Sequence, residues 1–127
     1  MAVAPVTHLV DSVILIDHFN GIAAATAFLR ANGDRLAVSV ITRAEVLTGF
    51  DAEGEGLALA LLRRFPTLGI DEAVADLAAR MRRQKKWKMP DAFQAALAIH
   101  HGLKLATRNT RDFDPKTFPF VEVPYQL

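Results

Sequence analysis

The 127-residue sequence contains no cysteine, which excludes disulfides, zinc–thiolate sites and a thiol nucleophile. It has no apolar stretch long enough to span a membrane, and its N-terminus lacks the basic start of a signal peptide. The lack of cysteine fits a reducing compartment. We therefore expect a soluble, cytoplasmic protein that does not contact a membrane. A serine-elbow motif is also missing, so the sequence offers no obvious covalent nucleophile.

Charge of one sign does not dominate either, since the net charge is only +1. The length is typical of one domain, and the apolar fraction of 51% is high for a soluble domain. Some of the apolar residues in 13–19 and 57–65 could therefore cover a partner, although most are expected in the core. Basic residues gather in one run: Arg80, Arg82, Arg83, Lys85, Lys86 and Lys88. This run is either a phosphate-binding surface or a solvated helix face.

Short apolar segments alternate with amphipathic ones along the chain. Strands are predicted at 6–10, 36–41, within 66–70, at 103–106 and at 118–123. Helices are predicted at 12–19, 22–31, 42–48, 57–65, 71–86 and 90–101, with Ser12, Thr42 and Asp71 as N-caps. This order favours an α/β fold with a parallel sheet and helices on both faces.

Acidic residues follow the ends of several predicted strands. Asp11 ends the first strand, and Glu45 lies one turn into the helix after the second. Asn109 and Asp112 follow the fourth strand, while Asp91 starts the helix that precedes it. Ligands of such sheets bind at the carboxyl ends of the strands. In a parallel sheet the residues that follow the first, second and fourth strands share one edge, and the pattern permits but does not require Asp91 to reach it from the start of its helix.

Clustered carboxylates repel one another and need a counter-ion, for which a hard divalent cation such as Mg²⁺ is suited. Two such ions can assist an in-line displacement at phosphorus. Each acid also has a structural explanation: Asp11 as a turn residue, Glu45 as the partner of Thr42 in a capping box, and Asp91 as a first-turn acid. Asp17 is expected to be a solvated or structural acid.

Four segments together resemble the PIN-domain family, in its order and spacing. They are Leu9 to Asp17 (LVDSVILID), Ser39 to Gly49 (SVITRAEVLTG), Pro90 to Ala98 (PDAFQAALA) and Leu105 to Phe113 (LATRNTRDF). The chain resembles the VapC type, the toxin half of a bacterial toxin–antitoxin pair. The resemblance implies a single PIN domain over residues 1–127, with a PIN-like three-layer α/β/α sandwich and a mostly parallel central sheet.

The resemblance also implies an endoribonuclease that depends on Mg²⁺, with Mn²⁺ as a possible substitute. It maps the acidic site onto Asp11, Glu45 and Asp91, with a fourth polar position at Asn109 or Asp112. Asp112 is assigned as catalytic and Asn109 as a metal ligand. Ser12 stands where the family has serine or threonine, and its hydroxyl would orient Asp11 or a metal-bound water.

Several basic residues are predicted to bind the RNA: Arg43, Arg108, Arg111, Arg83 and Lys86. Trp87 is expected to pack rather than to stack on a base. His100 and His101 are expected to interact with the C-terminus of their helix. The resemblance implies a VapB-type antitoxin as partner and self-association into a homodimer or a larger assembly.

Two other functions would require features that the sequence lacks or would usually lack features that it has. An aspartyl-phosphate enzyme would need a second acid two residues after Asp11, where Val13 stands, or the paired acids of a receiver. A PIN-like scaffold that binds RNA or a partner without cutting it would usually lack a core acid, yet Asp11, Glu45 and Asp91 are all present. Metal-dependent RNA cleavage remains the leading prediction.

Overall fold

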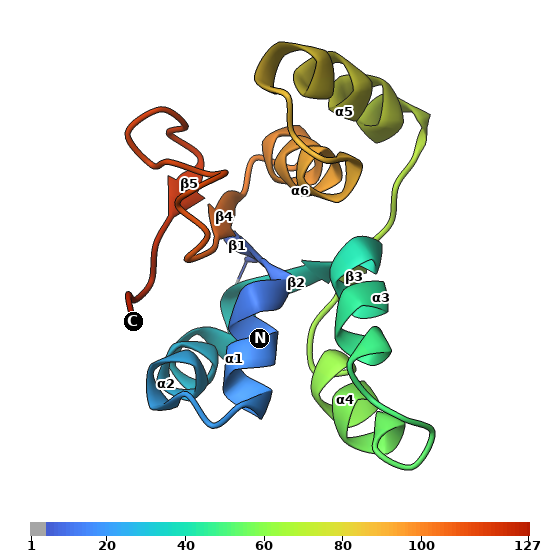
Figure 1. Ribbon diagram of the computed structural model, residues 1–127, viewed down its shortest axis with the longest axis vertical. Helices are drawn as coiled ribbons and strands as arrows, with labels where there is room; N and C mark the ends of the chain where they lie inside the picture. Colours follow the sequence, from blue (N-terminus) through green and yellow to red (C-terminus); the bar gives the residue numbers. More distant parts are fainter. Residues whose placement is uncertain (1–4) are drawn as a thin grey trace.

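The computed structural model describes residues 5–127 as a five-stranded sheet between two layers of helices (Figure 1). The expectation about a signal peptide concerns residues 1–4, which lie outside this description. The strands are β1 His8–Val10, β2 Leu36–Ser39, β3 Thr67–Leu68, β4 Lys104–Ala106 and β5 Val121–Glu122. The helices are α1 Ser12–Phe19, α2 Ala23–Asn32, η1 Gly33–Arg35 (a 3-10 turn), α3 Val40–Thr48, α4 Glu55–Leu62, α5 Glu72–Lys85 and α6 Met89–His100.

All pairings in the sheet are parallel, and the strand order is β3-β2-β1-β4-β5. Successive strands run outward from β1 in one direction through β2 and β3. The chain then crosses back to the other side of β1 for β4 and β5. The order therefore reverses at β1, where open α/β sheets bind their ligands. The predicted three-layer α/β fold is confirmed.

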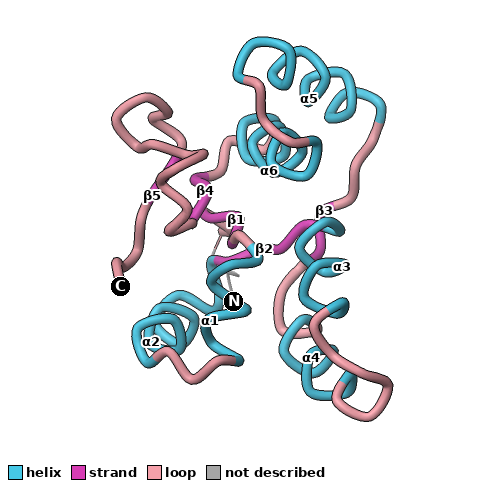
Figure 2. Tube along the Cα trace, in the orientation of Figure 1, coloured by secondary structure: helices cyan, strands magenta, loops and turns pink. Residues whose placement is uncertain are grey.

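The two helical layers follow from the alternation of side chains along each buried strand. Leu9 of β1 joins the core under α5 and α6, whereas Val10 joins the core formed with α1 to α4. Leu105 and Ala106 of β4 divide in the same way. In Figures 1 and 2, α5 and α6 lie on one side of the sheet and α1 to α4 on the other.

The second strand is shorter than predicted, which corrects the expected strand 36–41. β2 ends at Ser39, and Val40 already belongs to α3. Ser39, not Thr42, is the N-cap, because its Oγ accepts a hydrogen bond of 2.9 Å from the Thr42 backbone N–H. Glu45 therefore lies in the sixth position of α3 and forms no capping box with Thr42. The structural explanation of Glu45 as the partner of Thr42 in a capping box is therefore wrong.

The first helix begins as predicted, but its N-cap is Asp11 rather than Ser12. The Asp11 carboxylate accepts a hydrogen bond from the Ser12 backbone N–H at 2.9 Å. The other bounds shift by a few residues, since helix ends fray and local sequence defines them weakly. The helix predicted at 57–65 begins at Glu55 and ends at Leu62, and the strand predicted at 118–123 shortens to Val121–Glu122.

The residues at the two ends of α6 suit the backbone conformations found there. Pro90 lies in the first turn of α6, where its missing N–H has no helical partner to lose. At the other end Gly102 has φ +66°, and the Leu103 N–H binds the Ala98 carbonyl at 2.8 Å. The chain thus turns directly into β4. Since α6 runs antiparallel to β4, its first residues, Asp91 among them, lie at the carboxyl edge of the sheet.

Candidate functional site

Three of the predicted acids meet in one hollow of about 410 Å³ at the point where the strand order reverses. The hollow is lined by Asp11, Ser12, Val13, Glu45, Asp91, Arg108, Asn109, Thr110 and Arg111. These residues come from the segments that follow β1 and β4, from the first turns of α1 and α6, and from the second turn of α3. The predicted convergence of Asp11, Glu45 and Asp91 at one edge is therefore present in the structure.

Asp11 forms the buried floor of the hollow, with only 7% of its surface exposed. Its Oδ1 accepts hydrogen bonds from the Ser12 N–H at 2.9 Å and from Gln94 Nε2 at 3.2 Å. Its Oδ2 accepts one from Thr107 Oγ1 at 2.7 Å. These donors offset the cost of burying the charge and hold the carboxylate in one orientation.

Glu45 lies on α3, and its side chain is next to that of Ser12, the residue that was predicted to support the site. Withdrawal of its carboxyl from solvent raises its pKa, although the residue as a whole remains exposed. A hydrogen bond with the Ser12 side chain lowers the pKa, and the Asp11 charge raises it. Ser12 thus contacts Asp11 through its backbone and Glu45 through its side chain.

Asp91 shows the strongest sign of crowded negative charge. Its pKa is raised to about 6, first by burial and then by the charges of Asp112, Asp11 and Glu45, in that order. Lys88 is the one group that opposes this increase. A cleft carboxyl with a pKa perturbed by other carboxylates is typical of a functional site.

Asn109 and Asp112 act as a pair. Asn109 Nδ2 donates to Asp112 Oδ2 at 3.0 Å, and the Asp112 N–H lies 3.4 Å from Asn109 Oδ1. Asn109 lines the hollow. Asp112 does not line it, but its charge raises the pKa of Asp91.

Trp87 holds the loop that carries Asn109 and Asp112, because its Nε1 donates to the Asp112 carbonyl at 2.9 Å and its ring packs on Phe113. The predicted packing role of Trp87 is confirmed.

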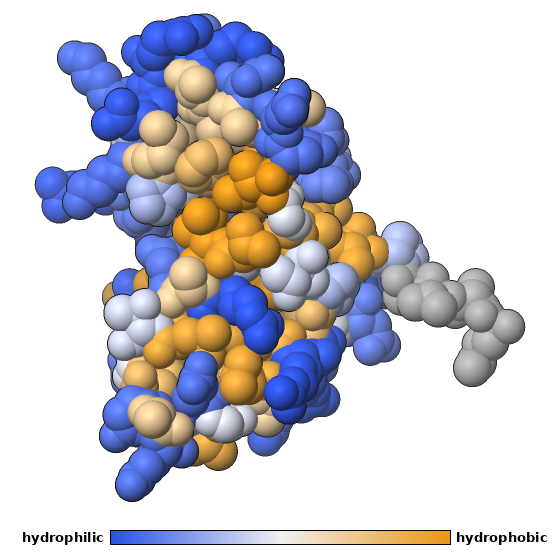
Figure 3. Space-filling model, turned by 90° about the vertical axis from the view of Figure 1, so that its right-hand side faces the viewer, coloured by the Kyte–Doolittle hydropathy of each residue, from blue (hydrophilic) through white to orange (hydrophobic). Residues whose placement is uncertain are grey.

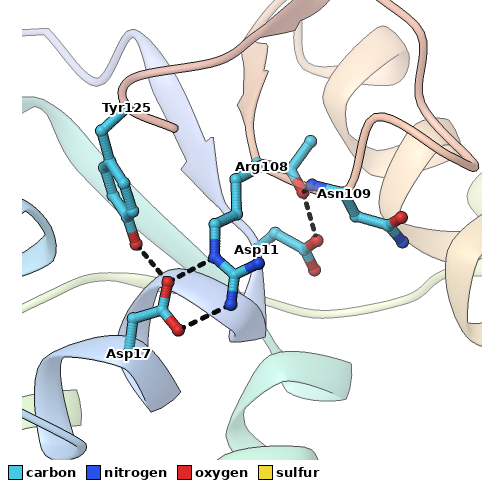
Figure 4. A network of polar contacts seen from close by, with 6 residues as sticks. Asp11, Asp17, Arg108, Asn109 and Tyr125 are labelled. Atoms are coloured by element: carbon cyan, nitrogen blue, oxygen red, sulfur yellow. Dashed lines mark hydrogen bonds and ion pairs between the residues drawn. The ribbon is translucent and has the colours of Figure 1, made fainter. Parts of the chain in front are cut away.

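The guanidinium of Arg108 points toward Asp17 and is joined to it by two contacts (Figure 4). It forms an ion pair with Asp17, which is 4% exposed, and Tyr125 also donates to that carboxylate. The hydrogen bond from Arg108 is the main cause that lowers the pKa of Asp17, against the effect of burial. Asp17 is therefore a structural acid. The RNA contact predicted for Arg108 would compete with this internal pairing.

The remaining basic candidates lie in different places. Arg111 is exposed and lines the hollow. Arg83 and Lys86 are exposed at the end of α5, and Arg43 is half-buried on α3; none of the three lines it. Among the residues predicted to bind RNA, Arg111 is thus the one that both lines the hollow and is exposed to solvent.

Three polar residues at the site were missed in the sequence. Ser39, Gln94 and Thr107 are buried, and each lies within a hydrogen-bond network around Asp11. A signal for Gln94 existed: it is a lone polar residue in the alanine-rich segment of α6, one helical turn after Asp91. Thr107 and Ser39 each end a buried strand, as Asp11 does.

The donor set at this edge fits a hard divalent cation, because it consists of carboxylate oxygens with surplus negative charge. Asp11, Glu45 and Asp91 would hold such an ion, with Asn109 as a neutral oxygen donor. Within residues 5–127, no three Asp, Glu or His side chains converge into a complete direct ligand set. Mg²⁺ tolerates this spacing, since it retains several water ligands and takes only one or two carboxylates.

A larger hollow of about 730 Å³ lies between the ends of α2 and α4. Arg30, Arg35, Arg64 and His18 line it, and Asp34 is its one acid. It lacks a carboxylate cluster, so the smaller hollow is the better candidate for metal-dependent chemistry.

A parallel α/β sandwich with carboxylates at its topological switch point defines the class of the protein, an α/β protein with an acidic site. A family model described as PIN domain matches residues 8–118. The chain belongs to the PIN-domain family, as the four sequence segments predicted. No curated protein matches the chain in sequence.

Solved structures agree with this assignment. A toxin–antitoxin complex from Klebsiella pneumoniae is similar, with 35% identity, a TM-score of 0.84 and coverage of 95% of this chain and 100% of that one. FitAcB from Neisseria gonorrhoeae has 24% identity and a TM-score of 0.77, with coverage of 95% and 100%. DNA-bound VapBC from Salmonella typhimurium has 20% identity and a TM-score of 0.76, with coverage of 94% and 99%. These neighbours are consistent with a PIN domain of the VapC type.

In residues 5–127, no single helix has the length and apolar character needed to cross a membrane. Two consecutive segments, Ser12–Phe19 and Ala23–Arg35, have this length and apolar character only when they are combined, and the chain bends by 119° between them.

Proposed function

We propose that this protein is an Mg²⁺-dependent endoribonuclease and the toxin component of a toxin–antitoxin pair. The main support is the meeting of Asp11, Glu45 and Asp91 in one hollow, where burial and then the repulsion of neighbouring carboxylates raise the pKa of Asp91. The nearby guanidinium of Arg108 is paired with Asp17, so its charge is already balanced there. The similarity to structures of toxin–antitoxin complexes supports the biological role.

The residues have separable tasks in this proposal. Asp11, fixed by its three donors, and Asp91 would hold the cation, while Glu45 and Ser12 would orient a water at the mouth of the hollow. When bound, Mg²⁺ would supply an activated water and stabilise charge that develops on the phosphate oxygens. Asp112 would keep Asn109 oriented through their hydrogen bond, and Arg111 would bind a neighbouring phosphate.

The proposal is tested by incubating the purified protein with a mixture of folded RNAs. Cleavage is expected with Mg²⁺ or Mn²⁺, to stop in excess chelator and to resume when Mg²⁺ is restored. Asp91→Asn should abolish cleavage while the circular dichroism spectrum is retained. Asp34→Asn, an acid in the other hollow, is the matched control and should cleave normally. Chelator-resistant cleavage, or full activity of Asp91→Asn, would contradict the proposal.

An antitoxin partner and toxin self-association belong to the same proposal. Within 57–65, Ala58, Leu62 and Phe65 are buried in the core, but Leu57 on α4 is 70% exposed, and Val40 on α3 is 38% exposed. Figure 3 shows apolar side chains across the middle and lower part of the side on which α3 and α4 lie. Co-purification with the product of a short neighbouring gene tests the partner, and light scattering tests the oligomeric state. A cytoplasmic location is proposed with this role.

The alternative is a PIN-like scaffold that binds RNA or a partner without cutting. The complete acidic set disfavours it, since a degenerate site should bind Mg²⁺ or Mn²⁺ poorly. Calorimetric titration with Mn²⁺ separates the two functions without requiring the natural RNA.

A further inference from the structure

Gln94 occupies the centre of the buried polar network behind the acids. Its side chain is 1% exposed. Nε2 donates to Asp11 Oδ1 at 3.2 Å and to Thr42 Oγ1 at 2.8 Å, and Oε1 accepts from Ser39 Oγ at 2.6 Å. Both amide protons and the carbonyl are therefore used. A flipped amide would place its oxygen against the Asp11 carboxylate, so the network fixes the orientation of the amide.

The same network links the three elements that present the acids. Gln94 lies three residues after Asp91 on α6, and Thr42 lies three residues before Glu45 on α3. Residues with this spacing share one face of a helix. The Gln94–Thr42 hydrogen bond therefore ties the turn carrying Asp91 to the turn carrying Glu45, and the bond to Asp11 ties both to the end of β1.

The donors on Asp11 also determine which of its lone pairs remain available. A carboxylate offers about four acceptor sites, two on each oxygen. Ser12 N–H and Gln94 Nε2 occupy both sites of Oδ1, and Thr107 Oγ1 occupies one site of Oδ2. One site of Oδ2 is left for a ligand from the hollow.

From these contacts we propose that Gln94 is the positioning residue of the acidic centre: it blocks Oδ1 of Asp11, so that a cation binds Oδ2 alone, and it sets the separation of Asp11, Glu45 and Asp91. The inference rests on the proposed metal-dependent function. Groups that orient metal ligands commonly contribute tenfold to a hundredfold to metal affinity.

The test replaces Gln94 with methionine, which has a similar length and no hydrogen-bonding amide. Mn²⁺ binding is measured by calorimetry on the purified full chain, and stability is measured by urea unfolding in chelator. Leu97→Met is the matched control, since Leu97 is fully buried in α6 and lies outside the network. We expect Gln94→Met to weaken Mn²⁺ binding by about tenfold or more, while Leu97→Met stays within about twofold of the original protein.

A second variant, Thr42→Val, keeps the volume of the side chain and removes one anchor of Gln94. It keeps the proposal testable if Gln94→Met does not fold, and we expect a smaller loss, about threefold to tenfold. In cleavage assays both variants should need more metal for half-maximal rate and recover most of kcat at saturating Mn²⁺. Unchanged Mn²⁺ affinity in either folded variant would overturn the positioning role while leaving the proposed function intact. Absence of Mn²⁺ binding by the original protein would overturn both.

Discussion

Arg108 binds Asp17 through two parallel hydrogen bonds, from Nε to Oδ2 at 2.6 Å and from Nη2 to Oδ1 at 2.9 Å (Figure 4). Tyr125 adds a third, from its hydroxyl to Oδ2 at 2.6 Å. Burial and the hydrogen bond to Asp17 both raise the pKa of Tyr125, so it stays a neutral donor at physiological pH. Because Arg108 directly follows Thr107, this triad anchors the loop that contacts Asp11 to α1 and to the C-terminal segment.

Tyr125→Phe should lower the free energy of unfolding by about 1–2 kcal/mol, because it removes one hydrogen bond to a buried charge. The ring and its packing are retained, so the loss reports the hydroxyl alone. Urea unfolding at pH 7.5 measures it. An unchanged midpoint would show that the hydroxyl contributes nothing to the triad.

Arg111 and Arg108 should respond differently to removal of their charge. In an Asp91→Asn background, Arg111→Gln should weaken RNA binding and reduce the slope of log affinity against log salt by about one. Arg108→Gln should mainly lower stability, because it leaves Asp17 buried with only Tyr125 as side-chain donor. Fluorescence anisotropy with a labelled RNA, together with urea unfolding, separates the two. Equal salt slopes for both variants would contradict this assignment.

The acidic site was predictable because parallel topology relates strand ends to one another. Asp11 ends an apolar strand and so lies at the carboxyl edge, and the pattern permits Asp91, which begins a helix that leads into another strand, to reach the same edge. Glu45 reaches the same hollow from the second turn of α3. Its capping-box explanation failed because Ser39, rather than Thr42, begins α3.

The rest of the site depended on tertiary contacts that no local pattern specifies. Val40 and Ile41 have strand propensity, yet the Ser39 cap places them in a helix, because the N-cap hydrogen bond outweighs a weak intrinsic preference. Gln94 acts on Asp11, which is 83 residues away in sequence. Likewise, the pairing of Arg108 with Asp17 spans 91 residues, and basic composition alone predicted an RNA contact instead.

Trp87→Phe should loosen the loop that carries Asn109 and Asp112. Phenylalanine retains an aromatic ring beside Phe113 but cannot donate to the Asp112 carbonyl, so a stability loss of about 1–2 kcal/mol is expected. Amide hydrogen exchange should rise selectively at Phe113, whose N–H binds the Asn109 carbonyl at 3.0 Å. Phe118→Leu is the control, because Phe118 packs on the same indole without this hydrogen bond. Exchange at Phe113 that is unchanged in Trp87→Phe would contradict the anchoring role.

Asp91→Asn should make the metal-free protein more stable at neutral pH, even though it removes a functional group. Burial and neighbouring carboxylates raise the pKa of Asp91 from 3.8 to about 6, so folding disfavours its ionised form. Below pH 3.8 the carboxyl is protonated in both states and the substitution has no effect through this group. Between about pH 4 and 6 the unfolded chain ionises first, so the original protein progressively loses stability relative to Asp91→Asn. Above about pH 6 the difference is constant.

The full shift corresponds to at most about 3 kcal/mol, and solvent screening of this half-buried carboxyl reduces the expected gain to about 1 kcal/mol. Urea unfolding in chelator from pH 4 to 8 measures the difference. Saturating Mg²⁺ should reverse the order, because only the original protein gains binding free energy, about 2.7 kcal/mol when the ion is at a hundred times its dissociation constant. A stability difference that does not grow with pH in chelator would show that Asp91 is not held among uncompensated carboxylates.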